Sequence, residues 1–439
     1  MTLLITAVLK RDSGIPSRPA PRAAVHNDNR MPGIGLPPGP RLTMLMERSP
    51  SPRGAARRPS TFSRRRAVFA CAAVVLAVAA AEGGRWTRAA RAAAAPSQVD
   101  APVPGRATLS ELSRTMVPMP KNVPSAHASA LAALPGDRMV AFWWAGSRES
   151  GPDVKVYASR WADGKWGAPW EVASRESLGK SLGFGVRRIG NPVAWTGRDG
   201  RLHLYVVATG LGGWAASRVV HMVSPDAGAS FAVRRVLPAS PMFNTSTLVR
   251  TSAVGLEDGG WWLPLYFELG IKYPMLMSFD AGGEPNWVGR IGARTTTLQP
   301  AIVPVSRLEV RAWMRDASDE RRVQHALSRD GGASWEDLPA LDLHNESTSV
   351  AALRLANGDF LMLHNDAVAG GSSRSTLRLS ISSDGRTWHT VADVASGSAG
   401  DEFSYPTMQQ VGSELHVTYT FQRQAIAHHR YRIRIGEPI

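Results

Sequence analysis

The chain has 439 residues, enough for two to four ordinary domains or for one large repeat fold with a tail. Its net charge of +15 would suggest a nucleic acid or an anionic membrane as partner if that charge were spread evenly. Residues 1–100, however, hold 16 Lys and Arg against 5 Asp and Glu, which leaves 35 against 31 for residues 101–439. The body of the chain is therefore nearly balanced, and we predict no nucleic-acid partner.

The N-terminal region has the pattern of an export signal. An apolar run, Ala67–Ala81, follows three consecutive arginines, and in a helix it would reach only about 22 Å, short of the ~30 Å hydrocarbon core of a membrane. This pattern predicts a signal-peptide core in a periplasmic or secreted protein, with an uncleaved N-terminal anchor as the alternative. Residues 1–66 are predicted to be a disordered basic leader, or the product of a start codon placed too early, and residues 82–104 an Ala-rich linker.

The single cysteine, Cys71, lies inside this leader. A mature chain would have no disulfide, no thiolate metal site and no cysteine nucleophile. Since His, Asp and Glu occur nowhere at metal-ligand spacing, we predict no metal and no cofactor.

From residue 105 onward the sequence consists of short apolar, β-branched or aromatic runs broken by Gly, Asp, Asn, Ser and Pro, with almost no helical periodicity. Many strands at close spacing predict an all-β sandwich, barrel or propeller. The clearest runs are Met139–Trp144, Val154–Ala158, Leu202–Val207, Trp261–Phe267, Val323–Leu327, Phe360–Leu363, Leu377–Ile381 and Leu415–Phe421.

A repeated turn motif selects among these architectures. Ser328–Trp335 has the form S-x-D-x-G-x-x-W, Ser224–Phe231 matches it with Phe in the last place, and Ser382–Trp388 is one residue shorter. Looser copies occur at Ala162–Trp166 and Ser278–Trp287. In such a turn the Asp caps backbone N–H groups, the Gly adopts a positive φ and the aromatic ring packs beneath. The copies indicate repeated hairpins.

A second set of positions marks where the inner strand of each repeat is expected to begin. Their spacings of 64, 53, 55, 46 and 60 residues are close to the ~40–50 residues of a propeller blade with longer loops. We therefore predict a six-bladed β-propeller over residues 105–439, in which the inner-strand ends converge on one face. The positions are His127, Asn191, Asn244, Gln299, Asn345 and Tyr405.

With these motifs, residues 120–435 resemble the sialidase (neuraminidase) superfamily, in particular its bacterial branch of Asp-box, or BNR-repeat, proteins. His127–Leu131 is similar to the family's opening strand, and Gln299–Ile302 followed by Arg315 is similar to the segment that carries a catalytic Glu and then a carboxylate-binding Arg. Ser404–Pro406 is similar to the strand that carries the nucleophilic Tyr. The resemblance implies a sialidase-like propeller and exo-sialidase activity on an acidic sugar.

In that family three arginines bind the sugar carboxylate, a Tyr activated by a Glu attacks the anomeric carbon, and an Asp acts as acid and base. Carried over by position, Tyr405 would be the nucleophile, Arg315 would bind the carboxylate and Asp153 would be the acid and base, with Glu149 as its alternative. Further substrate-binding candidates are Arg148, Asn191, Asn345 and Arg374, with Arg423 a third possible inward-facing arginine.

Two departures from the family pattern affect the expected chemistry. His127 stands where the family has its first carboxylate-binding Arg, and Gln299, which cannot usefully accept a proton, stands where it has the base for the Tyr. Each candidate also has a structural alternative: an ion pair with Asp316 for Arg315, and core packing for Tyr405 and His127. Trp143, Trp144 and Trp214 are candidates for stacking on a sugar, although core packing is the better expectation.

Three functions remain open, in this order. The first is an exported exo-glycosidase that cleaves a terminal α-linked acidic sugar from a sialoglycoconjugate or another acidic glycan. The second is a polysaccharide lyase, in which Arg315 neutralises a uronate and His127 or Tyr405 moves the proton. The third is a glycan-binding propeller without activity. In each case we expect a monomer that meets the membrane only through the possible N-terminal anchor.

Overall fold

The computed structural model describes residues 61–89, 95–240, 244–366 and 373–436. Of the predicted disordered leader, residues 1–66, the first 60 residues lie outside the described part of the chain. Helix α1 (Thr61–Ala89) contains the apolar run Ala67–Ala81, whose side chains are almost all exposed. Neither described helix combines the length and the apolar character that a membrane span requires. The other is α2 (Arg175–Leu182), which Ser174 caps at its N-terminus.

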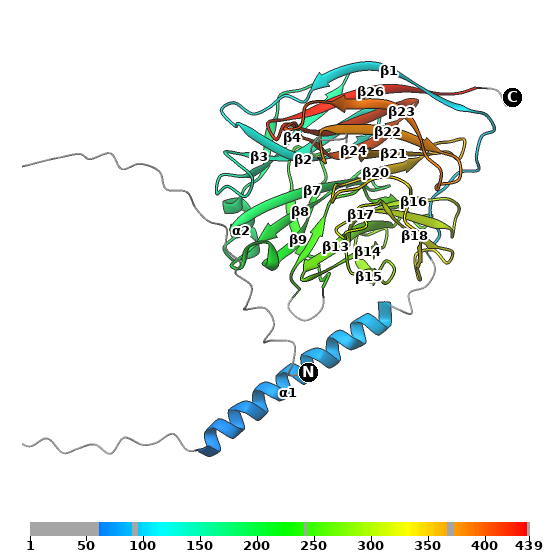
Figure 1. Cartoon of the computed structure of the whole chain (residues 1–439). Coiled ribbons are helices and arrows are strands. Elements are labelled where there is room, and N and C mark those ends of the chain that lie inside the picture. The colour runs from blue at the N-terminus through cyan, green and yellow to red at the C-terminus, as the bar shows by residue number, and fades with distance from the viewer. Residues whose placement is uncertain (1–60, 90–94, 241–243, 367–372, 437–439) are drawn as a thin grey trace, which may run out of the picture. The chain divides into compact units, whose positions relative to one another are not determined.

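The described residues after 95 form a six-bladed β-propeller, which confirms the predicted fold (Figure 1). Each blade is an antiparallel sheet, and in all but the sixth its strands follow one another in the chain from the axis outward. Blade 1 comprises β2 (Ser125–Leu134), β3 (Arg138–Gly146), β4 (Lys155–Ala162), β5 (Lys165–Trp166) and β6 (Trp170–Ala173). Blade 2 comprises β7 (Arg188–Thr196), β8 (Leu202–Thr209), β9 (Ser217–Ser224) and β10 (Ala232–Val236), with a 3-10 turn at Gly213–Ala216. Blade 3 comprises β11 (Thr247–Val249), β12 (Val254–Gly255), β13 (Trp261–Leu269), β14 (Ile271–Phe279) and β15 (Pro285–Arg290).

Blades 4 to 6 complete the ring. Blade 4 comprises β16 (Thr297–Pro304), β17 (Val310–Asp316), β18 (Gln324–Ser328) and β19 (Glu336–Leu338). Blade 5 comprises β20 (Ala351–Arg354), β21 (Phe360–Asn365), β22 (Thr376–Ser382) and β23 (His389–Ser396). Blade 6 comprises β24 (Phe403–Val411), β25 (Glu414–Phe421) and β26 (Ala425–Ile435).

The ring is closed by a strand from the other end of the propeller sequence. Strand β1 (Ala107–Met116) pairs antiparallel with β26, from Ala107 opposite Ile435 to Met116 opposite Ala427. Figure 1 shows β1 lying along β26 at the outer edge of blade 6. Because one blade contains both ends of the propeller sequence, opening the ring requires this pairing to break.

The Asp-box turns have the predicted geometry. The carboxylate of Asp330 accepts hydrogen bonds from the backbone N–H and hydroxyl of Ser334, and Gly332 has a φ of 82°. A Cβ added at Gly332 would lie 3.2 Å from Trp262, so a larger residue there would require the core side chains to shift. The neighbouring Trp335 donates its indole N–H to the Gly332 carbonyl. This turn therefore packs the outer part of blade 4 against the aromatic core of blade 3.

A segment preceding β1 packs against the propeller, although the sequence assigns residues 82–104 to a linker. The backbone N–H groups of Ser97, Gln98 and Val103 donate to carbonyls in the hairpins of blades 4, 3 and 5 respectively. Together with the later parts of the inner strands, Gln98–Asp100 lines a cavity of about 430 Å³. Residues 95–104 are therefore part of the folded propeller unit.

Candidate functional site

The site is built on irregularities at the starts of inner strands. In β2, β7, β16 and β24 the pairing with the next strand skips two residues, which is a β-bulge. The bulges of three of these strands contain a non-glycine residue with positive φ: Ala128 (56°), Gln299 (51°) and Tyr405 (53°). Such strained backbone is concentrated at functional sites in proteins, and bulges redirect side chains. The bulges thus mark the place where chemistry is expected.

Tyr405 and His127 lie against each other, so the structure brings together two residues that are far apart in sequence. Their ring centroids are 4.2 Å apart, and the His127 ring also lies 5.3 Å from that of Trp144. Tyr405 is half-buried, whereas His127 is only 2% exposed and its Nδ1 has no hydrogen-bond partner among the described residues. Burial, assisted by the charge of Arg423, holds the pKa of His127 well below its usual value. The imidazole is therefore neutral at pH 7.

Two arginines face the ring of Tyr405. The guanidinium carbon of Arg250 lies 5.2 Å and that of Arg374 5.7 Å from the ring centroid, which is cation–π distance. Arg374 was a predicted substrate-binding residue, whereas Arg250 was not singled out in the sequence. The candidate nucleophile thus lies in a positive environment.

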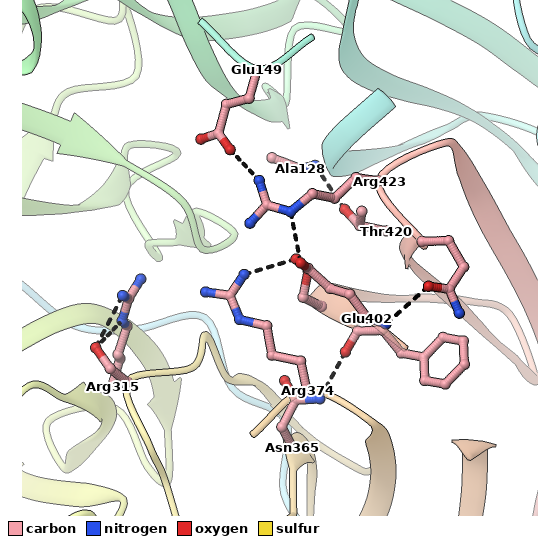
Figure 2. A network of polar contacts seen from close by, with 12 residues as sticks. Ala128, Glu149, Arg315, Asn365, Arg374, Glu402, Thr420 and Arg423 are labelled. Atoms are coloured by element: carbon pink, nitrogen blue, oxygen red, sulfur yellow. Dashed lines mark hydrogen bonds and ion pairs between the residues drawn. The ribbon is translucent and has the colours of Figure 1, made fainter. Parts of the chain in front are cut away.

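Glu402 holds two arginines of the site, Arg374 and Arg423 (Figure 2). Its carboxylate accepts from Arg374 Nη1 at 2.8 Å and from Arg423 Nε at 2.6 Å, and the Ser404 hydroxyl donates to it at 2.7 Å. Burial alone would raise the pKa of Glu402, but the hydrogen bonds from Arg423 and Ser404 and the charge of Arg374 lower it to about 2. The carboxylate is therefore ionised and fixes both guanidinium groups in place.

Gln299 does not contact Tyr405 by any described hydrogen bond. Its Nε2 donates to the hydroxyl of Tyr266 at 3.3 Å, and its Oε1 is buried without a partner among the described residues. Burial and the nearby Tyr405 phenol raise the pKa of Tyr266, whereas the Gln299 hydrogen bond and the charge of Arg315 oppose that rise. Gln299 thus contacts the phenol of Tyr266 and not that of Tyr405 by hydrogen bonding.

Arg315 extends from the end of β17 and lies apart from the Glu402 network in Figure 2. Its Nε and Nη2 donate to the hydroxyl of Ser347 at 3.1 and 3.0 Å. The expected alternative, an ion pair with Asp316, is not formed, since Asp316 accepts from the backbone and hydroxyl of Ser318 instead. Within the described residues no carboxylate neutralises Arg315.

The loop between β3 and β4 contributes Arg148, Glu149 and Asp153. Asp153 accepts from the backbone N–H and hydroxyl of Ser147, both at 2.7 Å, and the Ser147 hydroxyl bond is the main cause of its lowered pKa. Arg148 is exposed and its charge acts on Asp153. Glu149 forms an ion pair with Arg423, as Figure 2 shows. Of these three residues, only Glu149 has a described contact with the arginines around Glu402, namely Arg374 and Arg423.

The two predicted asparagines have structural contacts. Asn191 donates to the carbonyl of Val249, the residue before Arg250, at 3.2 Å. Asn345 is fully buried, accepts from the backbone N–H groups of Asp316 and Thr348, and donates to Thr348. Its amide thus holds the turn that presents Ser347 to Arg315. Trp143 and Trp144 are buried, as expected of core residues, and Trp214 packs against Gly190.

Sequence reasoning missed Glu402, Arg250 and Tyr266. Glu402 lies three residues before Tyr405, on the approach to β24, and this proximity was the available signal. Nothing in the local sequence of Arg250 or Tyr266 distinguishes them from strand residues, because their role arises from the meeting of different blades.

The described residues contain no group of His, Cys, Asp or Glu side chains suited to a metal ion. The 430 Å³ cavity does not include the site residues, since it is lined by the chain after the bulges, such as Ala301–Pro304 and Pro406–Gln410. The chemistry-bearing groups and this cavity therefore occupy different parts of the inner strands.

Comparison with known proteins agrees with this architecture. The chain is similar to a Hadza microbial sialidase, at 14% identity and a TM-score of 0.58 over 71% of this chain and 66% of that one. It is similar to a protein of unknown function from Dyadobacter fermentans, at 15% identity and a TM-score of 0.60 over 76% of this chain and 100% of that one. A sialidase of Trypanosoma rangeli in complex with the inhibitor DANA gives 14% identity and a TM-score of 0.57 over 73% of this chain and 59% of that one.

The chain thus spans less than two thirds of the length of these two sialidases, and at such identities the likeness establishes the fold alone. No curated protein matches the sequence. A family model, described as a BNR repeat-like domain, matches residues 137–417, which is more than half of the chain. This protein therefore belongs to the BNR repeat-like domain family, and its fold is a six-bladed propeller.

Proposed function

We propose that this chain is an exported exo-glycosidase of the sialidase type, which hydrolyses a terminal α-linked acidic sugar such as a sialic acid. The observation that carries the proposal is the meeting of arginines at one half-buried phenol, with Arg250 and Arg374 facing the ring of Tyr405. A sugar whose carboxylate adjoins its anomeric carbon has both the negative charge and the electrophilic carbon that this arrangement suits.

Arg315 is the main candidate for binding the substrate carboxylate. Arg374 and Arg423 share the carboxylate of Glu402, whereas the described contacts of Arg315 are to the neutral hydroxyl of Ser347. A guanidinium that lacks a carboxylate partner can form two parallel hydrogen bonds with an incoming carboxylate. Arg374, which Glu402 holds in place beside Tyr405, would support that binding.

The first chemical step would form a glycosyl–tyrosine intermediate. The Tyr405 oxygen attacks the anomeric carbon, and the new C–O bond forms as the glycosidic C–O bond breaks. The candidate acceptor of the phenol proton is the neutral imidazole of His127, whose ring centroid lies 4.2 Å from that of Tyr405. The leaving alcohol takes a proton from a carboxylic acid of the enzyme.

The second step reverses these roles. Water attacks the anomeric carbon, gives its proton to the carboxylate, and the Tyr405 oxygen leaves and recovers a proton from His127. The resemblance assigns the acid and base to Asp153, but Glu149 is the carboxylate in contact with the arginine cluster through Arg423. Asp153→Asn and Glu149→Gln distinguish them, because the acid variant should lose activity mainly on substrates with poor leaving groups.

A second candidate function is the uronate lyase, favoured by the neutral His127 beside Tyr405 and by the amide at position 299. Elimination needs a carboxylate binder and a proton acceptor but no carboxylate nucleophile. Arg315 and His127 would supply these two groups.

The test is turnover of a panel of fluorogenic sialosides and of uronate polymers. We expect release of the fluorophore by the wild type, loss of turnover in Tyr405→Phe and normal turnover in Tyr157→Phe, a matched control in blade 1. Formation of an unsaturated, ultraviolet-absorbing product from a uronate polymer would instead support the lyase. Absence of both products, with binding on a glycan array, would contradict both enzymatic assignments.

A further inference from the structure

Arg250 is a buried cation whose described partners are all uncharged. It follows β11 in blade 3 and is 2% exposed. Its guanidinium donates to the carbonyls of Ser129 at 3.2 Å and Pro406 at 2.7 Å, and to the hydroxyl of Thr407 at 3.2 Å. No carboxylate pairs with it within the described ranges. An uncompensated buried charge is costly to folding, so its retention requires a reason.

The contacts of Arg250 fix it relative to Tyr405. Pro406 and Thr407 directly follow Tyr405 in the bulge of β24, and Ser129 lies in the matching bulge of β2. The guanidinium therefore joins three blades at the point where the candidate nucleophile has its left-handed backbone conformation. Burial lowers the pKa of Arg250 to about 10, opposed by the phenols of Tyr405 and Tyr266, so that the group remains charged at pH 7.

We propose that Arg250 is a positioning residue that activates Tyr405, in that its fixed positive charge stabilises the negative charge that develops on the phenol oxygen. This inference rests on the proposed function, because it explains how Tyr405 could act although Gln299 cannot serve as its base. A fixed positive charge stabilises negative charge that develops close to it during a reaction. The phenol proton leaves to His127, and Arg250 itself gains and loses none.

Other charged or titratable groups lie around Tyr405 in the site, and the experiment must separate Arg250 from them. Each lies on a different element, so a substitution at position 250 leaves them in place. They are His127 from β2, Tyr266 from β13, Arg374 before β22, Glu402 before β24 and Arg423 after β25.

The test is the rate at which Tyr405 reacts with a phenolate-selective acylating reagent. Peptide mass spectrometry identifies the labelled residue, so the measurement does not require that the protein turns over a substrate. Arg250→Gln, which removes the charge and keeps a donor for Pro406, should slow labelling of Tyr405 by about tenfold or more. Arg250→Lys, which keeps the charge, should remain within about threefold of the wild type. In both variants labelling of Tyr157 in blade 1 should be unchanged.

A folded Arg250→Gln variant that labels as fast as the wild type would overturn the inference. If that variant does not fold, the inference still requires Tyr405 of the wild type to react faster than Tyr157. Equal rates would refute the role of Arg250. Rapid labelling of Tyr405 without hydrolysis of any sialoside would contradict the proposed function and leave the role of Arg250 standing. If the wild type hydrolyses sialosides but Arg250→Gln changes neither the labelling of Tyr405 nor kcat, the proposed function stands and the role of Arg250 is refuted.

Discussion

Buried histidines should make the propeller unstable in mild acid. Besides His127, burial lowers the pKa of seven further rings far below the ordinary value of about 6.5. In two cases the histidines form pairs, His203 with His221 at 2.9 Å and His416 with His428 at 3.0 Å between ring nitrogens. The folded-state pKa values are about 4 for His203, His364, His416 and His429, about 3 for His221 and His325, and about 2 for His428.

The sign and size of the effect follow from proton linkage. Because the unfolded chain binds these protons near pH 6.5 and the folded chain does not, the free energy of unfolding falls as the pH drops below that value. Each ring contributes about 1.4 kcal/mol at one pH unit below 6.5. Seven rings together reach at most about 10 kcal/mol at pH 5.5, comparable to the whole stability of an ordinary protein.

Urea unfolding followed by tryptophan fluorescence at pH 7.5 and pH 5.5 tests this reasoning. We expect the free energy of unfolding to fall by at least about 5 kcal/mol between them. His364→Gln, which removes one buried ring, should reduce the pH dependence, whereas His389→Gln, at an exposed position, should not. Equal stability of the wild type at both pH values would refute the argument, because the buried rings would then have to be protonated inside the fold.

Three further predictions concern the site, the turns and the closure of the ring. Glu402→Gln should lower the free energy of unfolding at pH 7 by about 2–3 kcal/mol, measured by urea unfolding, because two partly buried arginines lose their shared carboxylate; wild-type stability would contradict this. Asp330→Ala should cost about 1–2 kcal/mol through loss of the Asp-box hydrogen bonds. Asp342→Ala, at a 97% exposed carboxylate, should cost less than about 0.5 kcal/mol, and equal costs would argue against the turn. A chain starting at residue 95 should melt cooperatively, whereas one starting at residue 117 lacks β1 and should not; equal melting temperatures would show that β1 does not close the ring.

The fold could be predicted from the sequence because its signals are local and repeated. Each Asp-box is a turn whose Asp, Gly and aromatic residue act within about eight residues of one another. The spacing of the strand starts then gave the number of blades. The pairing of β1 with β26 was not predicted, since it joins residues more than 300 positions apart and no local pattern records it.

The sequence indicated only some residues of the candidate site, because they come from different blades and meet only after folding. Tyr405, His127 and Arg374 were named from a resemblance, and the structure places them in contact. Glu402 and Arg250 were not named, because their importance comes from the charges around them after folding. The positive φ values at the bulges could not be predicted either, because the residues there are not glycine and nothing in the sequence marks them.

The central claim is that Tyr405 is a nucleophile toward the anomeric carbon of an acidic sugar. Its most direct test is incubation with a fluorinated sialoside, whose glycosyl–enzyme intermediate decays slowly, followed by mass spectrometry of the digested protein. The account predicts a sugar adduct on the peptide that contains Tyr405 and none in Tyr405→Phe. An adduct on another residue, or hydrolysis of sialosides by Tyr405→Phe at the wild-type rate, would contradict it.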